Sequence, residues 1–227
     1  LVGETKISAE KILVATGGWP DIPTFTGSEH VISSNEAFSL DKLPERALVI
    51  GGGYIAIEFA GIYSGLGVET SLSYRGSLLL RNFDEDIRKF VSEEVAKKGI
   101  DIRYNSTLRM IEKKSNGVLE VTFADGSSLQ TDLVLCATGR KPNVQDLGLE
   151  NLEINCRENG AIIVDEQFRS SVPSIFALGD VTDRIQLTPV AIAEAMTFAN
   201  THFNGQQTVL NYEGIPTAVF CQPNISA

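Results

Sequence analysis

The sequence predicts an α/β fold in which a parallel sheet is joined to a β-meander, and three observations carry this prediction. A strand, a glycine turn, a helix and a second strand follow one another between Arg46 and Arg75. Further on, the hairpin signals Asn116-Gly117 and Asp125-Gly126 separate three runs of alternating apolar and polar residues. The apolar run LVLCAT, at 133–138, then ends in glycine, as expected of a buried parallel strand.

The first element expected along the chain is a short buried strand. KILVAT, at 11–16, is apolar and β-branched, and Gly17-Gly18 stop it. From Trp19 to Pro44 the pattern is irregular and prolines interrupt it. We therefore expect this stretch to connect two domains.

The segment from Arg46 to Arg75 has the order and length of one βαβ unit. Its helix carries Ile55, Phe59 and Ile62 or Tyr63 at the i, i+4, i+7 spacing of a face that packs on a sheet. The second strand is expected at 68–74, after a glycine-marked end of the helix.

The rest of the chain divides into further short elements. A helix is predicted at 84–98, because acidic residues occupy its first turn, lysines its last, and a glycine follows. The alternating runs predict hairpin strands near 108–113, 118–123 and 127–131. A short strand at 174–178 precedes a helix at 188–203, whose proline lies early, where a helix tolerates it.

Composition narrows the classes of function. The net charge of −10 over 227 residues argues against a nucleic-acid binder, whose surface is normally basic. Cys136, Cys156 and Cys221 form no close pair, so we expect neither a disulfide framework nor a metal site, and a reducing cytoplasm as location. The apolar runs are far shorter than the ~20 residues of a membrane span, so no membrane association is expected. The chain begins without Met, and we expect a fragment.

Glycines in the order Gly51-x-Gly53-x-x-Ala56 lie between the first strand and the helix of the βαβ unit. Because glycine has no Cβ, it permits a tight turn and a close approach of the backbone to a pyrophosphate. The free N–H groups and the positive end of the helix dipole then hold the anion. Such turns also occur for packing alone, but within a βαβ unit the pattern predicts a Rossmann-like domain that binds a dinucleotide.

The end of the second strand indicates which dinucleotide is bound. An NAD site usually places Asp or Glu there to accept from the ribose 2′-OH. This chain has Tyr74-Arg75 at that point and Arg81 shortly after, whereas Glu69 lies at the start of the strand. Two guanidinium groups suit a 2′-phosphate, so NADPH is predicted over NADH. The alternative is a pair of solvated surface arginines.

Phrases along the whole chain resemble, in order, those of the glutathione reductase group of the pyridine nucleotide-disulfide oxidoreductase family. They are KILVATGGWPDIP, SSNEAFSLDKLP, VIGGGYIAIEFAGIYSGLG, YRGSLLLRNFD, CATGRKPN, FALGDVTDRIQLTPVAIAEA and IPTAVFCQP. The resemblance implies an NADPH-binding domain and part of an FAD-binding domain of the same type. The implied division is the end of the first FAD-domain part at 1–17, a linker at 18–43, the NADPH domain at 44–140, the returning FAD part at 141–210 and the start of a dimer-interface domain at 211–227.

The resemblance also implies roles around NADPH. Tyr54 would be the ring that covers the nicotinamide pocket and swings aside when NADPH binds; an ordinary aromatic at a helix start is the alternative. Glu58 would lie under the nicotinamide, where family members pair it with a lysine from a segment absent here, so an unpaired or solvated residue is the alternative. The implied residues are Gly51, Gly52, Gly53, Tyr54, Ile55, Glu58, Arg75, Arg81, Gly139, Arg140 and Gln186.

The FAD contacts implied by the resemblance lie in the flanking segments. The Asp180 carboxylate would accept from the ribityl chain or the pyrophosphate region of FAD, and Thr188 would lie near the flavin ring. Without the resemblance, Gly179-Asp180 indicates only a turn with an acidic residue. The implied residues are Thr16, Gly17, Asp180 and Thr188.

The implied reaction is hydride transfer from NADPH to FAD, followed by reduction of a protein disulfide and thiol exchange with glutathione disulfide in a homodimer. The sequence contains neither the CxxxxC pair nor the His-Pro motif that the family uses, so no catalytic residue is assigned and the fragment alone is expected to be inactive. Cys136 is expected to be a buried small residue. Two alternatives stay open: a module that only binds NADPH, and a reductase of another disulfide such as trypanothione or mycothione.

Overall fold

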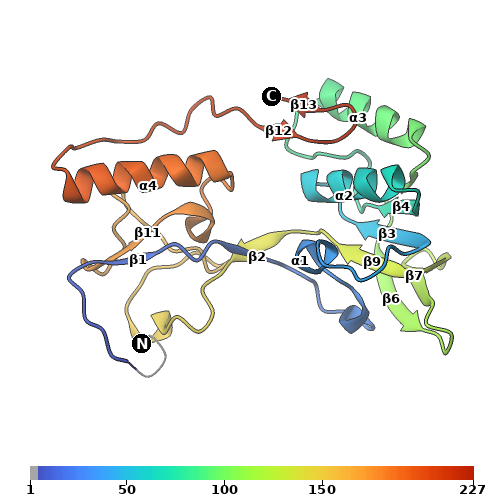
Figure 1. Cartoon of the computed structure of the whole chain (residues 1–227), viewed down its shortest axis with the longest axis horizontal. Coiled ribbons are helices and arrows are strands. Elements are labelled where there is room, and N and C mark those ends of the chain that lie inside the picture. Colours follow the sequence, from blue (N-terminus) through green and yellow to red (C-terminus); the bar gives the residue numbers. More distant parts are fainter. Residues whose placement is uncertain (1–4) are drawn as a thin grey trace. The chain divides into compact units, whose positions relative to one another are not determined.

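The computed structural model describes residues 5–227 as two compact units (Figure 1). Unit 1 combines the residues up to Trp19 with Arg140–Gly214, and unit 2 combines Pro20–Gly139 with Ile215–Ala227. The expected segment 1–17 begins with residues 1–4, which lie outside the described residues. Within 5–227, every helix is too short or too polar to cross a lipid bilayer.

Unit 2 is built on a parallel sheet, as predicted. Its strands are β3 (Arg46–Ile50), β4 (Glu69–Ser73), β5 (Asp101–Arg103) and β9 (Leu133–Cys136), in the spatial order β5-β4-β3-β9. All three neighbouring pairs are parallel. The helices α2 (Tyr54–Gly65) and α3 (Glu85–Lys97) make the crossovers β3-α2-β4 and β4-α3-β5. The predicted α/β class is therefore confirmed, and α3 lies within one residue of its expected bounds at each end.

The two faces of this sheet pack against different partners. Alternate residues of β3 point to opposite faces, so Ala47 and Val49 join the core cluster with α2 and α3, whereas Leu48 joins a cluster with the meander. On α2, Phe59 and Tyr63 are buried as predicted, but Ile62 is 47% exposed. The sequence could not distinguish Ile62 from Tyr63 because α2 is apolar on nearly all sides. The buried face of α2 is the one that carries Ala56 and Ala60, whose small side chains are fully buried.

The meander covers the second face. The strands β6 (Leu108–Lys113), β7 (Leu119–Phe123) and β8 (Ser128–Thr131) pair antiparallel in sequence order. In β7 the buried residues alternate with half-buried ones, which matches a strand with one face on the core. The hairpin predictions are thus confirmed.

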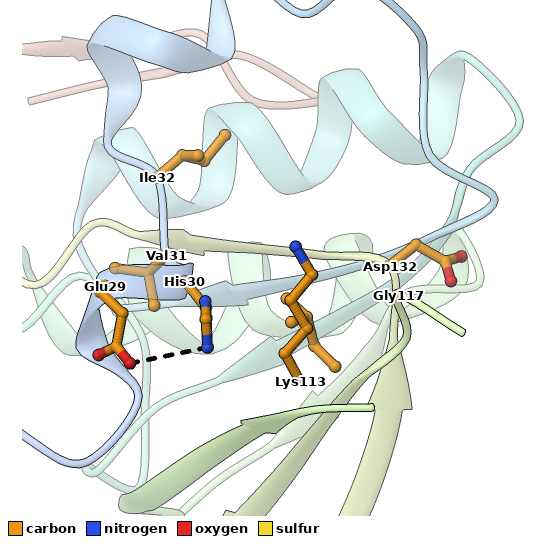
Figure 2. A pocket seen from close by; sticks show the side chains of 8 residues that line it. Glu29, His30, Val31, Ile32, Lys113, Gly117 and Asp132 are labelled. Carbon is orange, nitrogen blue, oxygen red and sulfur yellow. Dashed lines mark ion pairs between the residues drawn. The ribbon is translucent and has the colours of Figure 1, made fainter. Parts of the chain in front are cut away.

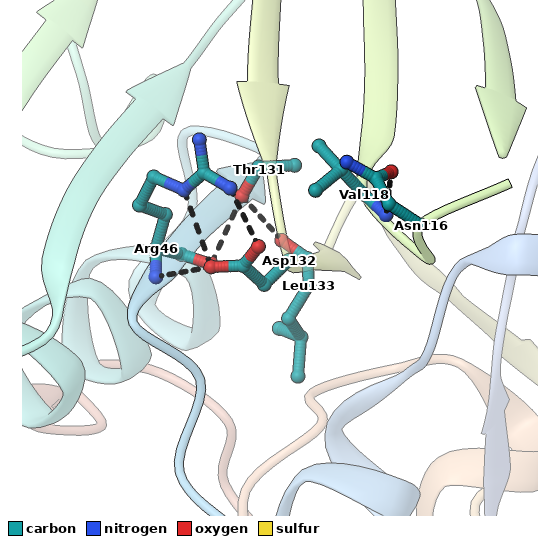
Figure 3. Close-up of polar contacts among 6 residues, drawn as sticks. All are labelled: Arg46, Asn116, Val118, Thr131, Asp132 and Leu133. Carbon is teal, nitrogen blue, oxygen red and sulfur yellow. Dashed lines mark hydrogen bonds and ion pairs between the residues drawn. The ribbon is translucent and has the colours of Figure 1, made fainter. Parts of the chain in front are cut away.

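An ion pair fastens the start of β3 to the turn between β8 and β9 (Figure 3). Arg46 Nη2 lies 2.7 Å from Asp132 Oδ1, and the Arg46 backbone N–H donates to Asp132 Oδ2 at 3.0 Å. Thr131 Oγ1 donates to the Arg46 carbonyl at 3.0 Å. The contacts join the meander to the amino end of the parallel strands.

The stretch expected as a linker makes specific contacts within unit 2. After β2 (Gly18–Pro20) it forms the short helices η1 (Ser28–His30) and α1 (Ser34–Ala37), the latter with a Ser33–Glu36 capping box. Ile32 runs beside β9, with its N–H donating to Val134 and its carbonyl accepting from Cys136. The division of the chain into five parts stays a prediction.

Unit 1 has a smaller sheet, in which β1 (Ile12–Val14) pairs parallel with β11 (Ile175–Ala177). Its other elements are β10 (Arg140–Pro142), which pairs with β2, η2 (Leu149–Asn151), η3 (Gly179–Thr182) and α4 (Thr188–Phe203), the last with the predicted bounds.

The expectation that the first strand is buried is wrong for most of β1. Ile12 and Leu13 are 48% and 41% exposed, whereas Val14 is buried. Among the described residues β1 pairs only with β11, and such a narrow sheet does not enclose both faces of an edge strand.

The last segment packs on unit 2. It forms β12 (Ala218–Val219) and β13 (Ile225–Ser226), which pair antiparallel. Val219 and Cys221 enter the same core cluster as α2, and burial raises the pKa of the Cys221 thiol. Cys221 is therefore a core residue.

Candidate dinucleotide site

The glycine turn follows β3 at the carboxyl edge of the parallel sheet, where ligands of open α/β sheets bind. Gly51 has φ 143°, and a Cβ there would overlap the carbonyl oxygen of Ala137. Gly53 is the N-cap of α2, and a Cβ there would meet no atom within 4 Å. The protein itself thus requires glycine at Gly51, while the space above Gly53 is open to a ligand.

Gly52 has a different reason to be glycine. A Cβ at this position would lie 2.5 Å from the ring of Tyr74, and one at Gly76 would lie 2.6 Å from the same ring. The Tyr74 ring therefore lies between the two glycines. This contact refines the expectation for Gly52, whose missing side chain makes room for a protein ring.

The predicted arginines lie on the loop that follows β4, and this loop is tied to the glycine turn. The Leu80 N–H donates to the Gly52 carbonyl at 2.7 Å. Arg75 and Arg81 are both exposed, and within the described chain neither forms a hydrogen bond or an ion pair. Arg46 and Arg103, by contrast, are paired with Asp132 and Asp101. The loop that contacts the glycine turn therefore carries two guanidinium groups without protein partners.

The start of α2 carries the other residues expected near the nicotinamide. Tyr54, its first residue, is 42% exposed, and Ile55 packs partly against the core. Glu58 is half-buried, and its Oε1 accepts a hydrogen bond from the Phe220 N–H at 2.8 Å. Glu58 therefore has a backbone partner in this chain, while its pairing with a lysine and its place under the nicotinamide stay predictions.

Gly139 and Arg140 lie on opposite sides of the boundary between the units. The Gly139 carbonyl accepts from the Asp21 N–H at 2.9 Å in unit 2. In unit 1, Arg140 Nη2 donates to the Gly18 carbonyl at 2.6 Å. The role of both residues at the NADPH site stays a prediction.

The residues expected to contact FAD all lie in unit 1. Thr16 Oγ1 donates to the Asn143 carbonyl at 2.6 Å, and Gly17 adopts φ 73° beside it. Asp180 lies in η3, where burial raises the pKa of its carboxyl while the nearby Arg140 charge opposes that shift. Thr188 is the exposed first residue of α4.

Gln186, expected near the nicotinamide, donates from Nε2 to Asp183 Oδ1 at 2.7 Å within unit 1.

A buried acid behind the Asp180 turn was missed by the sequence analysis. Glu194 on α4 is 1% exposed; its Oε2 accepts from the Gly179 N–H and its Oε1 from the Tyr212 hydroxyl, both at 2.6 Å. Arg184 Nη1 donates to the same hydroxyl at 2.9 Å. Burial, followed by the bond to Glu194, raises the pKa of Tyr212 to about 12. The available signal was an acidic residue within the apolar stretch of the helix.

Cys136 is 4% exposed in β9, as expected of a small core residue. Burial raises the pKa of its thiol, which makes the nucleophilic thiolate rarer. No group of three or more metal-ligating side chains occurs among residues 5–227.

Figure 2 shows a pocket in unit 2 whose lining does not include the glycine turn. Glu29, His30 and Lys113 line it, together with Asp132, which directly precedes β9. It therefore lies toward the amino edge of the parallel strands. Because the glycine turn is at the carboxyl edge, this pocket is separate from the candidate dinucleotide site.

Comparison with known proteins agrees with this geometry. The chain is 44% identical to the glutathione reductase of Burkholderia cepacia and 42% identical to the trypanothione reductase of Trypanosoma congolense, in each case over 97% of its length. These alignments cover 49% and 45% of the two relatives, so the chain spans about half the length of the curated relatives it matches.

A solved structure gives the same result for the fold. The HOCl-induced flavoprotein disulfide reductase RclA from Escherichia coli superposes with a TM-score of 0.93 at 28% identity, over all of this chain and 52% of that one. The family described as pyridine nucleotide-disulphide oxidoreductase matches residues 2–195. The chain therefore belongs to the pyridine nucleotide-disulphide oxidoreductase family.

Proposed function

We propose that this chain is the nucleotide-binding half of an NADPH-dependent flavoprotein disulfide reductase whose whole protein reduces glutathione disulfide. The observation that carries the proposal is the pair of exposed arginines, Arg75 and Arg81, without protein partners on a loop hydrogen-bonded to the glycine turn. A dinucleotide with a 2′-phosphate supplies the anionic partner that these guanidinium groups lack.

Different residues of unit 2 contact different parts of NADPH in this proposal. The free space above Gly53 admits the pyrophosphate to the start of α2, where backbone N–H groups and the helix dipole favour an anion. Arg75 and Arg81 bind the 2′-phosphate. Tyr54, exposed at the first position of α2, covers the nicotinamide pocket until NADPH enters.

FAD is the second cofactor of the proposed enzyme. When bound, FAD would accept a hydride from NADPH and supply the electron pair that reduces a disulfide. In unit 1, Thr16, Gly17 and Asp180 would hold FAD, and Thr188 would lie near its flavin ring. Glu194 supports the turn that carries Asp180, because it accepts from the N–H of Gly179.

Two disulfides are candidates for the electron acceptor of the whole protein. Glutathione disulfide is favoured because glutathione reductases from several organisms are similar to this chain, at 44% and 42% identity in two cases. Trypanothione disulfide is the second candidate, because trypanothione reductases are similar at 42%. Activity of the intact gene product with each disulfide separates the two. We further propose a cytoplasmic homodimer for the full protein.

The preference for NADPH is tested by comparing the dissociation constants of NADPH and NADH. In an Arg75→Glu, Arg81→Ala variant we expect the preference to fall by about 100-fold, since two charge-assisted contacts are lost. Arg109→Glu is the matched control: Arg109 is also exposed and unpaired within the described chain, but lies on β6 in the meander. Equal affinity of the unchanged chain for both nucleotides would overturn the choice of NADPH.

Visible absorption tests the flavin. A yellow full-length protein that NADPH bleaches supports the reductase. A colourless protein that binds NADPH favours the alternative of a binding module without catalysis.

A further inference from the structure

The loop between β4 and α3 has a backbone feature that the proposed NADPH contacts do not require. Leu80 has φ 53°, in the left-handed region that leucine seldom adopts. Residues held in such conformations cluster at ligand sites, where surrounding contacts enforce them. This uncommon backbone conformation lies directly before Arg81.

Several contacts hold Leu80 in this conformation. Its side chain is 2% exposed, and that of Leu79 is fully buried. The Leu80 N–H donates to Gly52, and its carbonyl accepts from Phe83 at 2.9 Å. These bonds fix Leu80 on both sides but do not reach the residues nearer to Arg75.

Arg88 supplies the missing restraint. From the first turns of α3 its half-buried side chain reaches back to the loop, where Nε donates to the Leu79 carbonyl and Nη2 to the Leu78 carbonyl, both at 2.8 Å. The planar guanidinium matches two successive carbonyls, whereas a lysine ammonium carries equal charge without this fork.

We propose that Arg88 is a positioning residue for the 2′-phosphate site. By holding the carbonyls of Leu78 and Leu79, it keeps Leu80 in its left-handed turn and presents Arg75 and Arg81 to the ligand. This inference rests on the proposed function, because it assumes that the two arginines bind a 2′-phosphate. Arg88 acts through the loop and makes no contact with the nucleotide.

The test compares 2′,5′-ADP with 5′-AMP by isothermal titration calorimetry on the full chain. These probes differ in the 2′-phosphate, so the ratio of their dissociation constants reports on that group alone. In Arg88→Lys, which keeps the charge, we expect the preference for 2′,5′-ADP to fall about tenfold and binding of 5′-AMP to change less than about twofold. A general loss of fold would weaken both ligands together.

Arg46→Lys is the matched control, because it also removes a guanidinium fork from unit 2 but at the amino edge of the sheet. An unchanged ratio in Arg88→Lys, or an equal fall in Arg46→Lys, would overturn the proposal. If Arg88→Lys does not fold, Arg88→Gln, which can still donate one bond to the loop, replaces it, and an unchanged ratio there has the same meaning. A ratio near one in the unchanged chain refutes NADPH preference itself, so the two failures are distinguishable.

Discussion

Unit 2 and unit 1 differ in how their polar side chains are used. In unit 2 the loop beside the glycine turn carries Arg75 and Arg81 without protein partners, on a scaffold with core clusters on both faces of its sheet. In unit 1 the polar groups around Asp180 are bonded to one another, as in the contacts of Glu194 with Gly179 and of Arg140 with Gly18.

Under the proposed function, this difference indicates how each unit would hold its nucleotide. In unit 2, the guanidinium groups of Arg75 and Arg81 have no protein partners, and a sheet packed on both faces supports the loop that carries them. Unit 1 has placed its donors and acceptors in a fixed network, but its two-stranded sheet leaves Ile12 and Leu13 largely exposed. Unit 2 has the more completely packed sheet, whereas unit 1 has the more completely hydrogen-bonded polar groups. The two features therefore occur separately in this chain.

The largest effect expected from this comparison is in limited proteolysis of the chain. Unit 2 should remain as a resistant core while unit 1 is cut first, because narrow sheets with exposed apolar residues open more easily. Mass spectrometry of the fragments gives the boundaries. Uniform protection of both units would contradict the difference.

Within unit 2, Gly51→Ala should destabilise the fold by about 3 kcal/mol, because φ 143° and the Ala137 carbonyl both oppose a Cβ. Gly53→Ala is the matched control and should cost under about 1 kcal/mol of stability, because the space is open. It should nevertheless weaken NADPH binding. Urea unfolding and nucleotide titration of both variants measure this, and equal stability losses would refute the assignment of the open space.

In unit 1, Glu194→Gln should destabilise by about 2 kcal/mol, because an amide has a single acceptor oxygen for the two donors, Gly179 N–H and Tyr212 hydroxyl. Glu158→Gln, at an exposed position of the same unit, should have almost no effect. Thermal unfolding followed by circular dichroism compares them. Similar melting temperatures for both variants would show that the network contributes little.

The smallest effect expected is a pH dependence of the same network. The pKa of Tyr212 is raised from 10.0 to about 12 in the folded chain, so its stabilising contribution is complete below pH 10 and is lost as pH rises toward 12. Tyr212→Phe should be less stable by about 1 kcal/mol at pH 8, and the gap should narrow above pH 10. Urea unfolding across this range tests the sign, and a constant gap would disprove it.

Elements with local signals were predictable from the sequence. The bounds of α4 and of β6 agree with the expected ranges, because proline, glycine and Asn-Gly positions mark their ends. The βαβ unit was recognisable for the same reason. Turns depend mainly on the residues that form them, so the ends of these elements can be predicted without tertiary contacts.

Features that depend on distant partners were not predictable. Glu58 is bonded to Phe220, far along the chain, and Cys221 enters a core whose other members lie mainly before residue 136. The exposure of Ile12 depends on how many strands cover it, which its own sequence does not encode. The requirement for glycine at Gly52 likewise depends on the position of the Tyr74 ring.

The Tyr74 ring between Gly52 and Gly76 has a consequence for sequence divergence. A methyl group at either glycine would collide with the ring, whereas a smaller residue at 74 would leave a gap beside both. Substitutions at Gly52, Tyr74 and Gly76 are therefore expected to depend on one another. Relatives that replace one of the glycines should also carry a smaller residue in place of the tyrosine, so the glycine turn and the arginine loop are expected to change together.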